Sequence, residues 1–303
     1  MGFKSEIFSL FGITVSCDEP MDKHTGYAVG GKADYYVTCY NLKGVVEIIE
    51  LCNYYKMDYL FIGNGSNIVI SDQGYRGVII SLKGLNSIWH DNGIVIAMSG
   101  VSLCDLVLFS AEYSLFGGEA LIGIPATVGG AVTMNAGAFN TNISDFVKEV
   151  QTIKDGKIVY YRNDECDFTY RHSRFLLNKE PIVCVKFKFN KQNNSSSHKK
   201  LINVCREKRR TNQPQGRSCG CVFRNPEGDY AGKIIDNLGL KGLRLGTAEV
   251  SCKHANFILA DKLACANDIY NLVQLIKKTV HEKTGILLKE EIQFIGKFNE
   301  FNG

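Results

Sequence analysis

The sequence predicts an α+β protein with two lobes, and three observations lead to that expectation. Short β-branched and aromatic runs crowd the first two-thirds of the chain, a polar segment at 190–200 contains no apolar residue, and helical patterns dominate the remainder. Runs of the first kind indicate strands, and a polar segment of this kind is typical of a linker. A chain of 303 residues is also longer than the roughly 100–200 residues of a usual domain.

The first lobe is expected to hold most of the strands. Five short runs predict strands at 34–38, 59–62, 68–70, 77–80 and 94–97. Apolar residues recur with helical period at about 42–56 and 102–113, so helices are expected between some of these strands. A further strand group is expected at 147–159, and a last strand at 181–189.

The second lobe is expected to be richer in helix. A basic helix at about 201–210 is followed by a helix near 231–238, and a long helix at 266–284 precedes a terminal strand at 287–295. We therefore place the main boundary near residue 195. The expected domains are 1–195, with subdomains of about 1–82 and 83–190, and 196–303.

The composition argues against several classes of protein. With 45% hydrophobic and 22% charged residues the chain is globular, and a net charge of +4 fits a small anionic ligand better than a nucleic acid. The basic run Arg206, Lys208, Arg209 and Arg210 is expected to form a solvated helix face. No apolar stretch approaches the roughly 20 residues of a membrane span, so we expect a soluble protein that does not bind membranes.

The cysteines and the N-terminal segment bear on compartment. The 11 cysteines include no Cys-x-x-Cys pair and the 6 histidines complete no zinc-like spacing, so no metal is expected. Free thiols spread through the chain indicate a reducing compartment, here the cytoplasm. The apolar run 7–13 before Cys17 looks somewhat like a lipoprotein signal, but it is short and Glu6 borders it. An amphipathic first helix is therefore the expectation.

Glycine-rich loops in the first lobe indicate a phosphate-bearing ligand. The loop 63–67 (Gly-Asn-Gly-Ser-Asn) lies between strand-like runs, where backbone N–H groups can converge on an anion, although a tight hairpin would explain this motif alone equally well. The loop 123–138 has mostly small uncharged residues, which bury little apolar area but let backbone approach a large flat ligand closely. A third glycine turn spans 27–33. Together the three loops fit a dinucleotide with a bulky ring system, and no P-loop pattern is present.

Several motifs follow one another along nearly the whole chain, from about residue 25 to residue 296. They are 25–33, 63–67, 123–138, 170–175, 220–226, 239–242, 250–257 and 291–296. One motif alone would be weak evidence, but in this order together they are highly specific. They resemble the motifs of the UDP-N-acetylenolpyruvoylglucosamine reductases, which are flavoenzymes of bacterial peptidoglycan precursor synthesis.

The resemblance implies a fold and a pair of substrates. The first lobe would be of the vanillyl-alcohol-oxidase type and hold FAD non-covalently, and the second lobe would close over a UDP-sugar. NADPH would donate the hydride, and UDP-N-acetylglucosamine enolpyruvate would accept it. The short passage after Phe189 looks like the shorter variant of the family, which lacks an extra substrate-covering loop. We expect the enzyme to be a monomer.

The resemblance also implies three catalytic residues. Arg171 would bind the substrate carboxylate, because a guanidinium stays charged and can bind it bidentately. Glu291 would help to polarise the intermediate, and its neighbour Glu290 would have no catalytic role. Cys221 stands where many relatives have serine as the proton donor, and a thiol is a competent acid there. Cys219 is a possible oxidation partner for it.

The motifs also imply residues that bind the cofactor and the substrate. The expected cofactor-binding residues are Gly30, Gly31, Ile62, Gly63, Asn64, Gly65, Ser66, Asn67, Gly123, Ile124, Pro125, Thr127, Val128, Gly129, Gly130, Ala131, Asn135 and Gly137. The expected substrate-binding residues are Tyr170, Arg210, Asn225 and Lys253.

Two positions depart from the family's pattern. Ala126 stands where a glycine is usual, which could alter the backbone of the second loop. Gln213 precedes Pro214, where some relatives have a substrate-binding lysine, and Arg210 or Lys208 could replace that lysine.

Alternative interpretations stay open at this point. Without the family, Arg171 would be an exposed loop arginine and Cys221 a small buried hydrophobe. Another flavoenzyme on the same scaffold, such as an oxidase of a small alcohol or sugar, commonly attaches flavin through histidine or cysteine, and the glycine-rich loops carry no histidine. A non-catalytic nucleotide-sugar binder would not need Arg171, Cys221 and Glu291 together.

Overall fold

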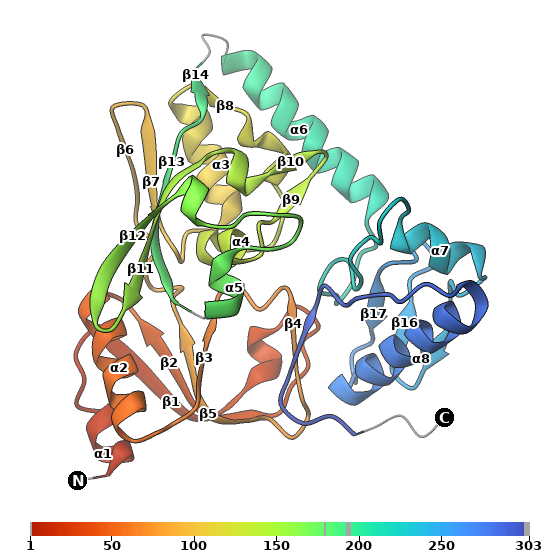
Figure 1. Ribbon diagram of the computed structural model, residues 1–303, viewed down its shortest axis with the longest axis horizontal. Coiled ribbons are helices and arrows are strands. Elements are labelled where there is room, and N and C mark those ends of the chain that lie inside the picture. The colour runs from red at the N-terminus through yellow and green to blue at the C-terminus, as the bar shows by residue number, and fades with distance from the viewer. Residues whose placement is uncertain (1, 179, 192–194, 300–303) are drawn as a thin grey trace. The chain divides into compact units, whose positions relative to one another are not determined.

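The computed structural model describes residues 2–178, 180–191 and 195–299, which form two compact units that interleave along the sequence (Figure 1). The first unit comprises the residues up to Cys17, Tyr35–Asn64 and Gly77–Arg209. The second comprises Asp18–Asp34, Gly65–Arg76 and the residues from Arg210 onward. The boundaries between them fall inside or beside several elements, namely β1 (Ile13–Pro20), β2 (Lys32–Cys39), β5 (Tyr75–Ser81) and α6 (Ser195–Asn212).

An antiparallel five-stranded sheet is the main sheet of the first unit, in the order β12-β11-β13-β7-β6 (Figure 1). Its strands are β6 (Ile88–Asp91), β7 (Ile94–Met98), β11 (Val147–Lys154), β12 (Lys157–Arg162) and β13 (Ile182–Phe187). Helices α3 (Leu103–Glu112) and α4 (Val128–Thr133) pack against it through a buried cluster that includes Leu106, Val132 and Val185.

A four-stranded sheet in the order β1-β2-β5-β3 carries the N-terminal helices. Strand β3 (Tyr59–Ile62) runs parallel to β5. Helix α1 (Phe3–Ile7) precedes β1, and α2 (Leu42–Tyr54) begins after Asn41, whose Oδ1 accepts a hydrogen bond of 2.8 Å from the Gly44 N–H. The buried residues of α2 recur at helical spacing and therefore form one apolar face. This face packs against apolar residues of the sheet.

Short elements complete the first unit. Two small antiparallel pairs join β8 to β14 and β9 to β10. These and the remaining elements are β8 (Leu115–Phe116), β9 (Gly137–Ala138), β10 (Thr141–Asn142), β14 (Asn190–Lys191), α5 (Arg174–Asn178) and the 3₁₀ turns η2 (Gly118–Leu121), η3 (Ile143–Asp145) and η4 (Asn163–Glu165).

The second unit is built around one long helix, α8 (Ala266–Thr284), which packs on β15 and β16 (Figure 1). Strand β4 (Ile68–Ile70) pairs in parallel with β18 (Gln293–Ile295), two segments more than 200 positions apart. The other elements are η1 (Met21–His24), α7 (Ala231–Asn237), β15 (Arg244–Leu245), β16 (Ala248–Val250) and β17 (Ile258–Ala260).

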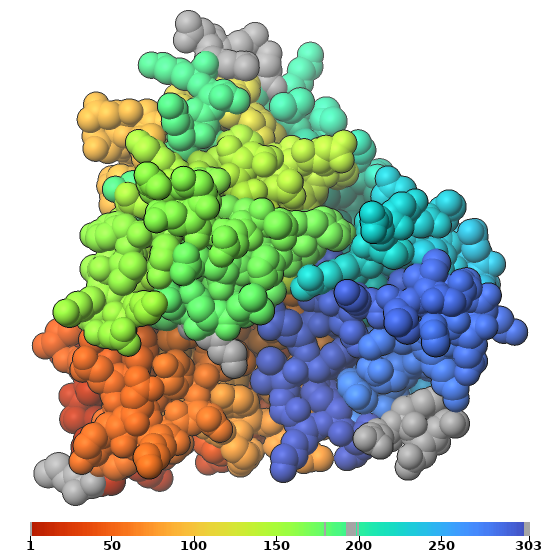
Figure 2. All heavy atoms as spheres, viewed as in Figure 1, coloured from red at the N-terminus to blue at the C-terminus, as the bar shows by residue number. Residues whose placement is uncertain are grey.

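Both ends of α8 follow from local chemistry. The Asp72 carboxylate accepts hydrogen bonds from the backbone N–H groups of Ala266, at 2.8 Å, and Asn267, at 2.9 Å, so it caps the first turn. Gly285 ends the helix with φ of 74°, a left-handed conformation that favours glycine. One face buries Leu272 and Ile276, and atoms from this blue part of the chain lie at the surface in the view of Figure 2.

Several expected elements are confirmed. Helices expected near 42–56, 102–113, 231–238 and 266–284 correspond to α2, α3, α7 and α8, and the mixed α and β composition is as predicted. The terminal strand is shorter than expected, since only Gln293–Ile295 is extended in a sheet.

The N-terminal prediction was wrong for most of the apolar run 7–13. Helix α1 ends at Ile7, Phe8 and Phe11 are exposed, and the chain enters β1 at Ile13. Gly12 has a φ of 77°, so the backbone turns there instead of continuing a helix.

The polar segment 190–200 is not a simple linker. Asn190–Lys191 form β14 and Ser195 begins α6, while 192–194 lie outside the described residues. The contacts divide the chain at Arg209, and parts of 18–76 belong to the second unit. The expected domain limits therefore stay a prediction. None of the helices described is long and apolar enough to cross a membrane.

Candidate active site

In the first unit, two of the expected cofactor loops pack together. The Asn64 Nδ2 donates to the Pro125 carbonyl at 3.0 Å. A Cβ on Gly63 would collide with the Thr127 hydroxyl, so the close approach of these loops requires glycine. Ile62 is buried at the end of β3, directly before the loop.

The second loop is held by helix α4. The Thr127 hydroxyl accepts from the Gly130 N–H at 3.3 Å, which caps the helix. The Val128 N–H donates to the Val101 carbonyl at 2.8 Å, and the Gly129 N–H donates to the Ser99 carbonyl at 2.9 Å. These amides therefore fix the loop and are already used within the protein. The nearest atom to a Cβ placed on Gly130 is 3.5 Å away, so its surface is open.

Alanine at position 126, where a glycine is usual, does not force the backbone of the loop into an unusual conformation. Ala126 is not among the described residues with positive φ, and its N–H donates to the Ile124 carbonyl at 2.8 Å. Gly123, in contrast, has a φ of 78°, and Arg209 of α6 packs on it. Glycine is therefore needed at Gly123 but not at position 126.

Arg209 departs from the solvated helix face that the basic run predicted. It is 9% exposed, and its Nη2 donates to the Ala120 carbonyl at 3.3 Å. Lys208 lies over the Phe139 ring, with its Nζ 4.7 Å from the ring centroid. The C-terminal end of α6 therefore packs against Gly123, the first residue of the loop 123–138.

Arg171 lies on a tight turn next to the same region. Thr169 and His172 exchange both backbone hydrogen bonds, and Arg171 has a φ of 54° at the tip of this turn. Its Nη2 donates to the Gly137 carbonyl at 3.0 Å, so two expected site residues are brought together. The guanidinium also lies 5.1 Å from the ring centroid of Tyr170. Arg171 is half-buried, not fully exposed.

Asn135 has an internal structural role. Its side chain is 4% exposed, its Nδ2 donates to the Thr169 carbonyl at 2.8 Å, and its Oδ1 accepts from the Ser144 N–H at 3.3 Å. The amide therefore links the turn that carries Arg171, through its Nδ2, to the 3₁₀ turn η3, through its Oδ1.

In the second unit, Cys221 and Glu291 lie on paired backbone segments. Phe223 and Glu290 form an antiparallel bridge, and the Glu291 N–H donates to the Val222 carbonyl at 2.8 Å. Both Cys221 and Glu291 are half-buried. The carboxylate of the neighbouring Glu290 pairs with the Lys277 Nζ at 2.6 Å.

Cys219 has a different environment from Cys221. Its thiol is buried and lies 3.4 Å from the Ile68 carbonyl. Burial raises the pKa of Cys219 to about 12, so it is a thiol and not a thiolate at neutral pH. A protonated thiol directed at backbone carbonyls is a poor oxidation partner for Cys221.

The remaining half of the 63–67 loop belongs to the second unit. Gly65 has a φ of 64° and a Cβ there would collide with the His24 carbonyl, while its own carbonyl accepts from Gly26 at 2.9 Å. The backbone N–H groups of Gly65 and Ser66 donate to no acceptor in the described part of the chain. Open amides beside glycines that admit no side chain fit a diphosphate group.

Gly30 and Gly31 line a cavity of about 390 Å³ in the second unit. Gly30 has a φ of 127°, and the Gly31 N–H donates to the Ser71 carbonyl at 2.9 Å. Arg217 and Asp72 also line this cavity, so its wall carries both signs of charge.

The expected substrate residues are on the surface. Tyr170 is half exposed, whereas Arg210 and Lys253 are exposed and in contact, since the Lys253 Nζ donates to the Arg210 carbonyl at 3.1 Å. The Asn225 Oδ1 accepts from the Ala231 N–H at 3.1 Å at the start of α7. Asn225 therefore also has a structural contact.

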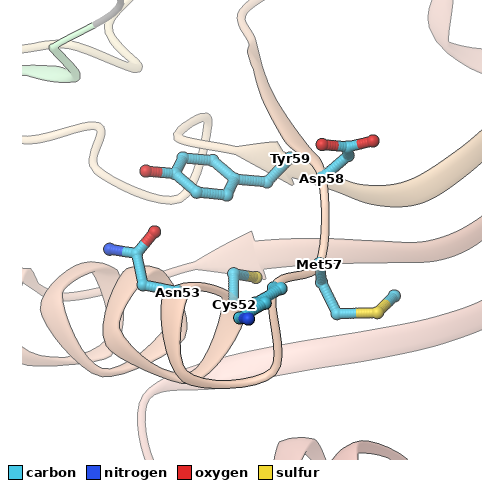
Figure 3. Close-up of a pocket in the computed structure, with 6 residues that line it drawn as sticks. Cys52, Asn53, Met57, Asp58 and Tyr59 are labelled. Atoms are coloured by element: carbon cyan, nitrogen blue, oxygen red, sulfur yellow. The ribbon is translucent and has the colours of Figure 1, made fainter.

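A pocket at the end of α2 contains none of the expected site residues. It has a volume of about 360 Å³ and is lined by side chains around Cys52 and Tyr59 (Figure 3). Burial raises the pKa of the Cys52 thiol to about 12, so this cysteine is not a nucleophile at neutral pH. In the described chain no group of three or more acidic, histidine or cysteine side chains could hold a metal ion.

The structure also reveals a buried residue that the sequence did not single out. Asn256 lies within the 250–257 motif, is 3% exposed, and hydrogen-bonds the backbone of Phe223, two residues after Cys221. Sequence pattern alone marks no such residue, because a buried asparagine looks the same as a surface one until its partners are known.

Comparison with known proteins gives matches over both units. A family model described as "FAD binding domain" matches residues 33–160, and one described as "UDP-N-acetylenolpyruvoylglucosamine reductase, C-terminal domain" matches residues 212–295. A protein named UDP-N-acetylenolpyruvoylglucosamine reductase from Clostridium novyi is 36% identical over 281 residues, covering 92% of each chain. One of the same name from Oceanobacillus iheyensis is 39% identical over 285 residues, covering 93% of this chain and 92% of the relative.

A solved structure agrees with these matches. The crystal structure titled UDP-N-acetylenolpyruvylglucosamine reductase from Thermus caldophilus superposes with a TM-score of 0.80 at 31% identity. The match covers 94% of this chain and 99% of that one.

Proposed function

The chain belongs to the UDP-N-acetylenolpyruvoylglucosamine reductase family, as its motifs predicted, and we propose that it reduces UDP-N-acetylglucosamine enolpyruvate to UDP-N-acetylmuramate with NADPH. It is an FAD-dependent oxidoreductase of peptidoglycan precursor synthesis. The net reaction consumes NADPH and one proton, and it converts the carbon–carbon double bond of the enol ether into a single bond.

The residues present fit FAD. Gly63 and Gly65 lie where side chains would collide with neighbouring backbone or hydroxyl groups, and the amides of Gly65 and Ser66 have no acceptor in the described chain. The loops 63–67 and 123–130 would hold the diphosphate and the ring system, and the motif resemblance assigns Gly30, Gly31, Asn135 and Gly137 to the same cofactor. Bound FAD would supply the redox chemistry, which is the transfer of a hydride from NADPH to the β-carbon of the enolpyruvyl group.

The chain's own task is to hold charge and deliver one proton. Arg171 binds the substrate carboxylate as negative charge builds on the neighbouring carbon, and a fixed donor of this kind stabilises the transition state by about 3 kcal/mol. The Cys221 Sγ–H gives its proton to the α-carbon, and solvent then reprotonates the thiolate. Glu291 lies on the adjacent segment and polarises the intermediate.

One observation carries this assignment: the backbone pairing of the Cys221 segment with the Glu291 segment. The Glu291 N–H bonds the carbonyl of Val222, the residue after Cys221, at 2.8 Å. A donor and a carboxylate on bonded neighbouring segments are suited to act on one substrate atom.

The substrate residues and the surroundings complete the proposal. Tyr170, Arg210, Asn225 and Lys253 bind the UDP-sugar, and the cations among them offset the charge of its diphosphate. The enzyme acts as a cytoplasmic monomer without a nucleic-acid partner. Size-exclusion chromatography with light scattering at micromolar concentration tests the monomer, and a dimer mass would refute it.

The test is an anaerobic stopped-flow experiment on the purified yellow protein. NADPH is added first and should bleach the flavin band, and UDP-N-acetylglucosamine enolpyruvate is added second and should restore it rapidly. Bleaching without recovery would show a flavin reductase with a different acceptor. A colourless protein that takes up no FAD would contradict the assignment altogether.

A further inference from the structure

Asn256 is a buried side chain that holds the segment carrying Cys221. Its Oδ1 accepts a hydrogen bond of 2.9 Å from the Phe223 N–H, and its Nδ2 donates one of 2.8 Å to the Phe223 carbonyl. The Asn256 carbonyl in turn accepts from the Val222 N–H at 2.9 Å. Three hydrogen bonds therefore fix the two residues that follow Cys221.

The same segment is bonded to Glu291 on its other side. The Val222 carbonyl accepts from the Glu291 N–H at 2.8 Å, and the Arg224 N–H donates to the Lys289 carbonyl at 2.9 Å. Val222 thus uses its N–H toward Asn256 and its carbonyl toward Glu291. A shift of this segment away from Asn256 would change the separation of Cys221 and Glu291 directly.

Glu291 is held from its far side as well. The Asn67 Nδ2 donates to the Glu291 carbonyl at 3.0 Å, and the Gln293 N–H donates to the Asn67 carbonyl at 2.9 Å. Glu291 therefore has a fixed backbone whether or not Asn256 is present. The position of Cys221 relative to Glu291 then depends on the direct bonds between the two segments and on the Asn256 contacts, which hold residues 222–223 from the other side.

An asparagine is the side chain that can make both bonds. Phe223 is fully buried, so its N–H and carbonyl each need a partner, and an unpaired buried backbone group is costly. An amide presents one acceptor and one donor in one plane, whereas a carboxylate can only accept and alanine can do neither.

We propose that Asn256 is a positioning residue for proton delivery, which holds Cys221 at a working distance from Glu291. This inference rests on the proposed function, in which Cys221 is the proton donor. Asn256 acts through the backbone of residues 222–223 and does not itself touch the substrate.

The experiment compares both half-reactions in Asn256→Ala and Asn256→Asp with the wild type. In Asn256→Ala, NADPH should bleach the flavin at the wild-type rate, but recovery on adding the enolpyruvyl sugar should slow by about 100-fold, as expected for a small displacement of a catalytic group. Asn256→Asp keeps the acceptor for the Phe223 N–H and should be intermediate. If the alanine variant does not fold, Asn256→Asp replaces it in the comparison with the wild type.

Asn163→Ala is the matched control. Its side-chain Nδ2 donates to the Ser144 and Val147 carbonyls, both at 2.8 Å, so the variant also loses two bonds to backbone, but in the first unit. It should lower the melting temperature while leaving both half-reactions unchanged. A loss of both half-reactions in proportion in Asn256→Ala would show a merely structural role and overturn the inference.

Alkylation of Cys221 gives a readout that needs neither substrate nor flavin. Iodoacetamide labelling, quantified by fragmentation of the peptide between Arg217 and Arg224, should be faster at Cys221 in Asn256→Ala, with buried Cys219 in the same peptide as internal reference. An unchanged Cys221 labelling rate with an unchanged recovery rate would refute the proposal. If the wild type itself fails to recover with the sugar, the proposed function is wrong, and the labelling still decides whether Asn256 positions Cys221.

Discussion

At the scale of single residues, two cysteines in one motif have opposite properties. Cys219 is buried against the Ile68 carbonyl, whereas Cys221 is half-buried and follows Gly220, where an added Cβ would meet no atom within 4 Å. Only Gly220 lies between them along the chain, yet burial keeps the Cys219 thiol from exchanging a proton with a ligand. Of the two, Cys221 is therefore the proton donor that we propose.

Replacing Cys221 tests the proton donor. Cys221→Ser should retain turnover, because a hydroxyl can supply the same proton. Cys221→Ala should bleach normally with NADPH but lose about 10²- to 10⁴-fold in the rate of recovery with the enolpyruvyl sugar. Both rates are measured by stopped-flow absorbance, and wild-type recovery in the alanine variant would show that another group donates the proton.

The Cys219 thiol should make stability depend on alkaline pH. Its pKa is raised to about 12 by burial, so its contribution to folding is fully present below the unfolded pKa near 9 and is lost as pH rises through 12. Between pH 7.5 and 10 this loss is about 1.4 kcal/mol. Urea unfolding of Cys219→Ala at both pH values should show a decrease in stability smaller than the wild type's by that amount. Equal decreases in the two proteins would mean that Cys219 does not titrate as inferred.

At the scale of elements, the cofactor loops are held by their own packing and not by the ligand alone. Gly63 lies directly against Thr127, which caps α4. Gly63→Ala should destabilise the flavin-free protein by about 1–3 kcal/mol through overpacking and lower its flavin content. Gly130→Ala is the control, because its Cβ meets no atom closer than 3.5 Å and alanine favours a helix. Thermal unfolding of the two flavin-free variants measures the difference. Equal melting temperatures of Gly63→Ala and Gly130→Ala would contradict the close contact between Gly63 and Thr127.

The cap of α8 is a second element-scale device. Asp72→Ala removes both acceptors at the helix start, which should cost about 1–2 kcal/mol in urea unfolding. Asp72→Asn keeps one acceptor oxygen and should cost less. If the two variants were equally stable, the carboxylate would not be acting as a cap.

Elements with a strong local pattern could be predicted, and those made by packing could not. Helix α8 repeats apolar residues at helical spacing and ends at a glycine, so its limits follow from the sequence. Helix α4 has only six residues of mostly small side chains, and it was expected as part of a loop. Among the candidate site residues, Arg171, Cys221 and Glu291 were predicted from motif resemblance. Asn256 needed the structure, because only its contacts distinguish it.

At the scale of the whole molecule, each of the two units is made of several separate stretches of the chain, so no single boundary divides them. A cut near 195 follows from the polar segment, but residues 18–34 and 65–76 pack with the second unit. Composition marks only the ends of segments, whereas a segment's partners depend on pairings such as β4 with β18, far apart in sequence. Sequence pattern thus indicated two lobes without showing that they interleave.

This interleaving predicts how a fragment behaves. A fragment of residues 1–209 keeps Tyr27, Val29 and Val69 but loses the cluster that buries them, and β4 loses β18. Exposing three such side chains costs roughly 5–8 kcal/mol, which is comparable to the entire stability of a typical domain. We therefore expect the fragment to bind a hydrophobic dye and to melt without a cooperative transition by circular dichroism, and co-expression with residues 210–303 to restore that transition. If the fragment instead unfolds cooperatively and retains FAD, the result would support an independent domain 1–195, because the first lobe would then fold without residues 210–303.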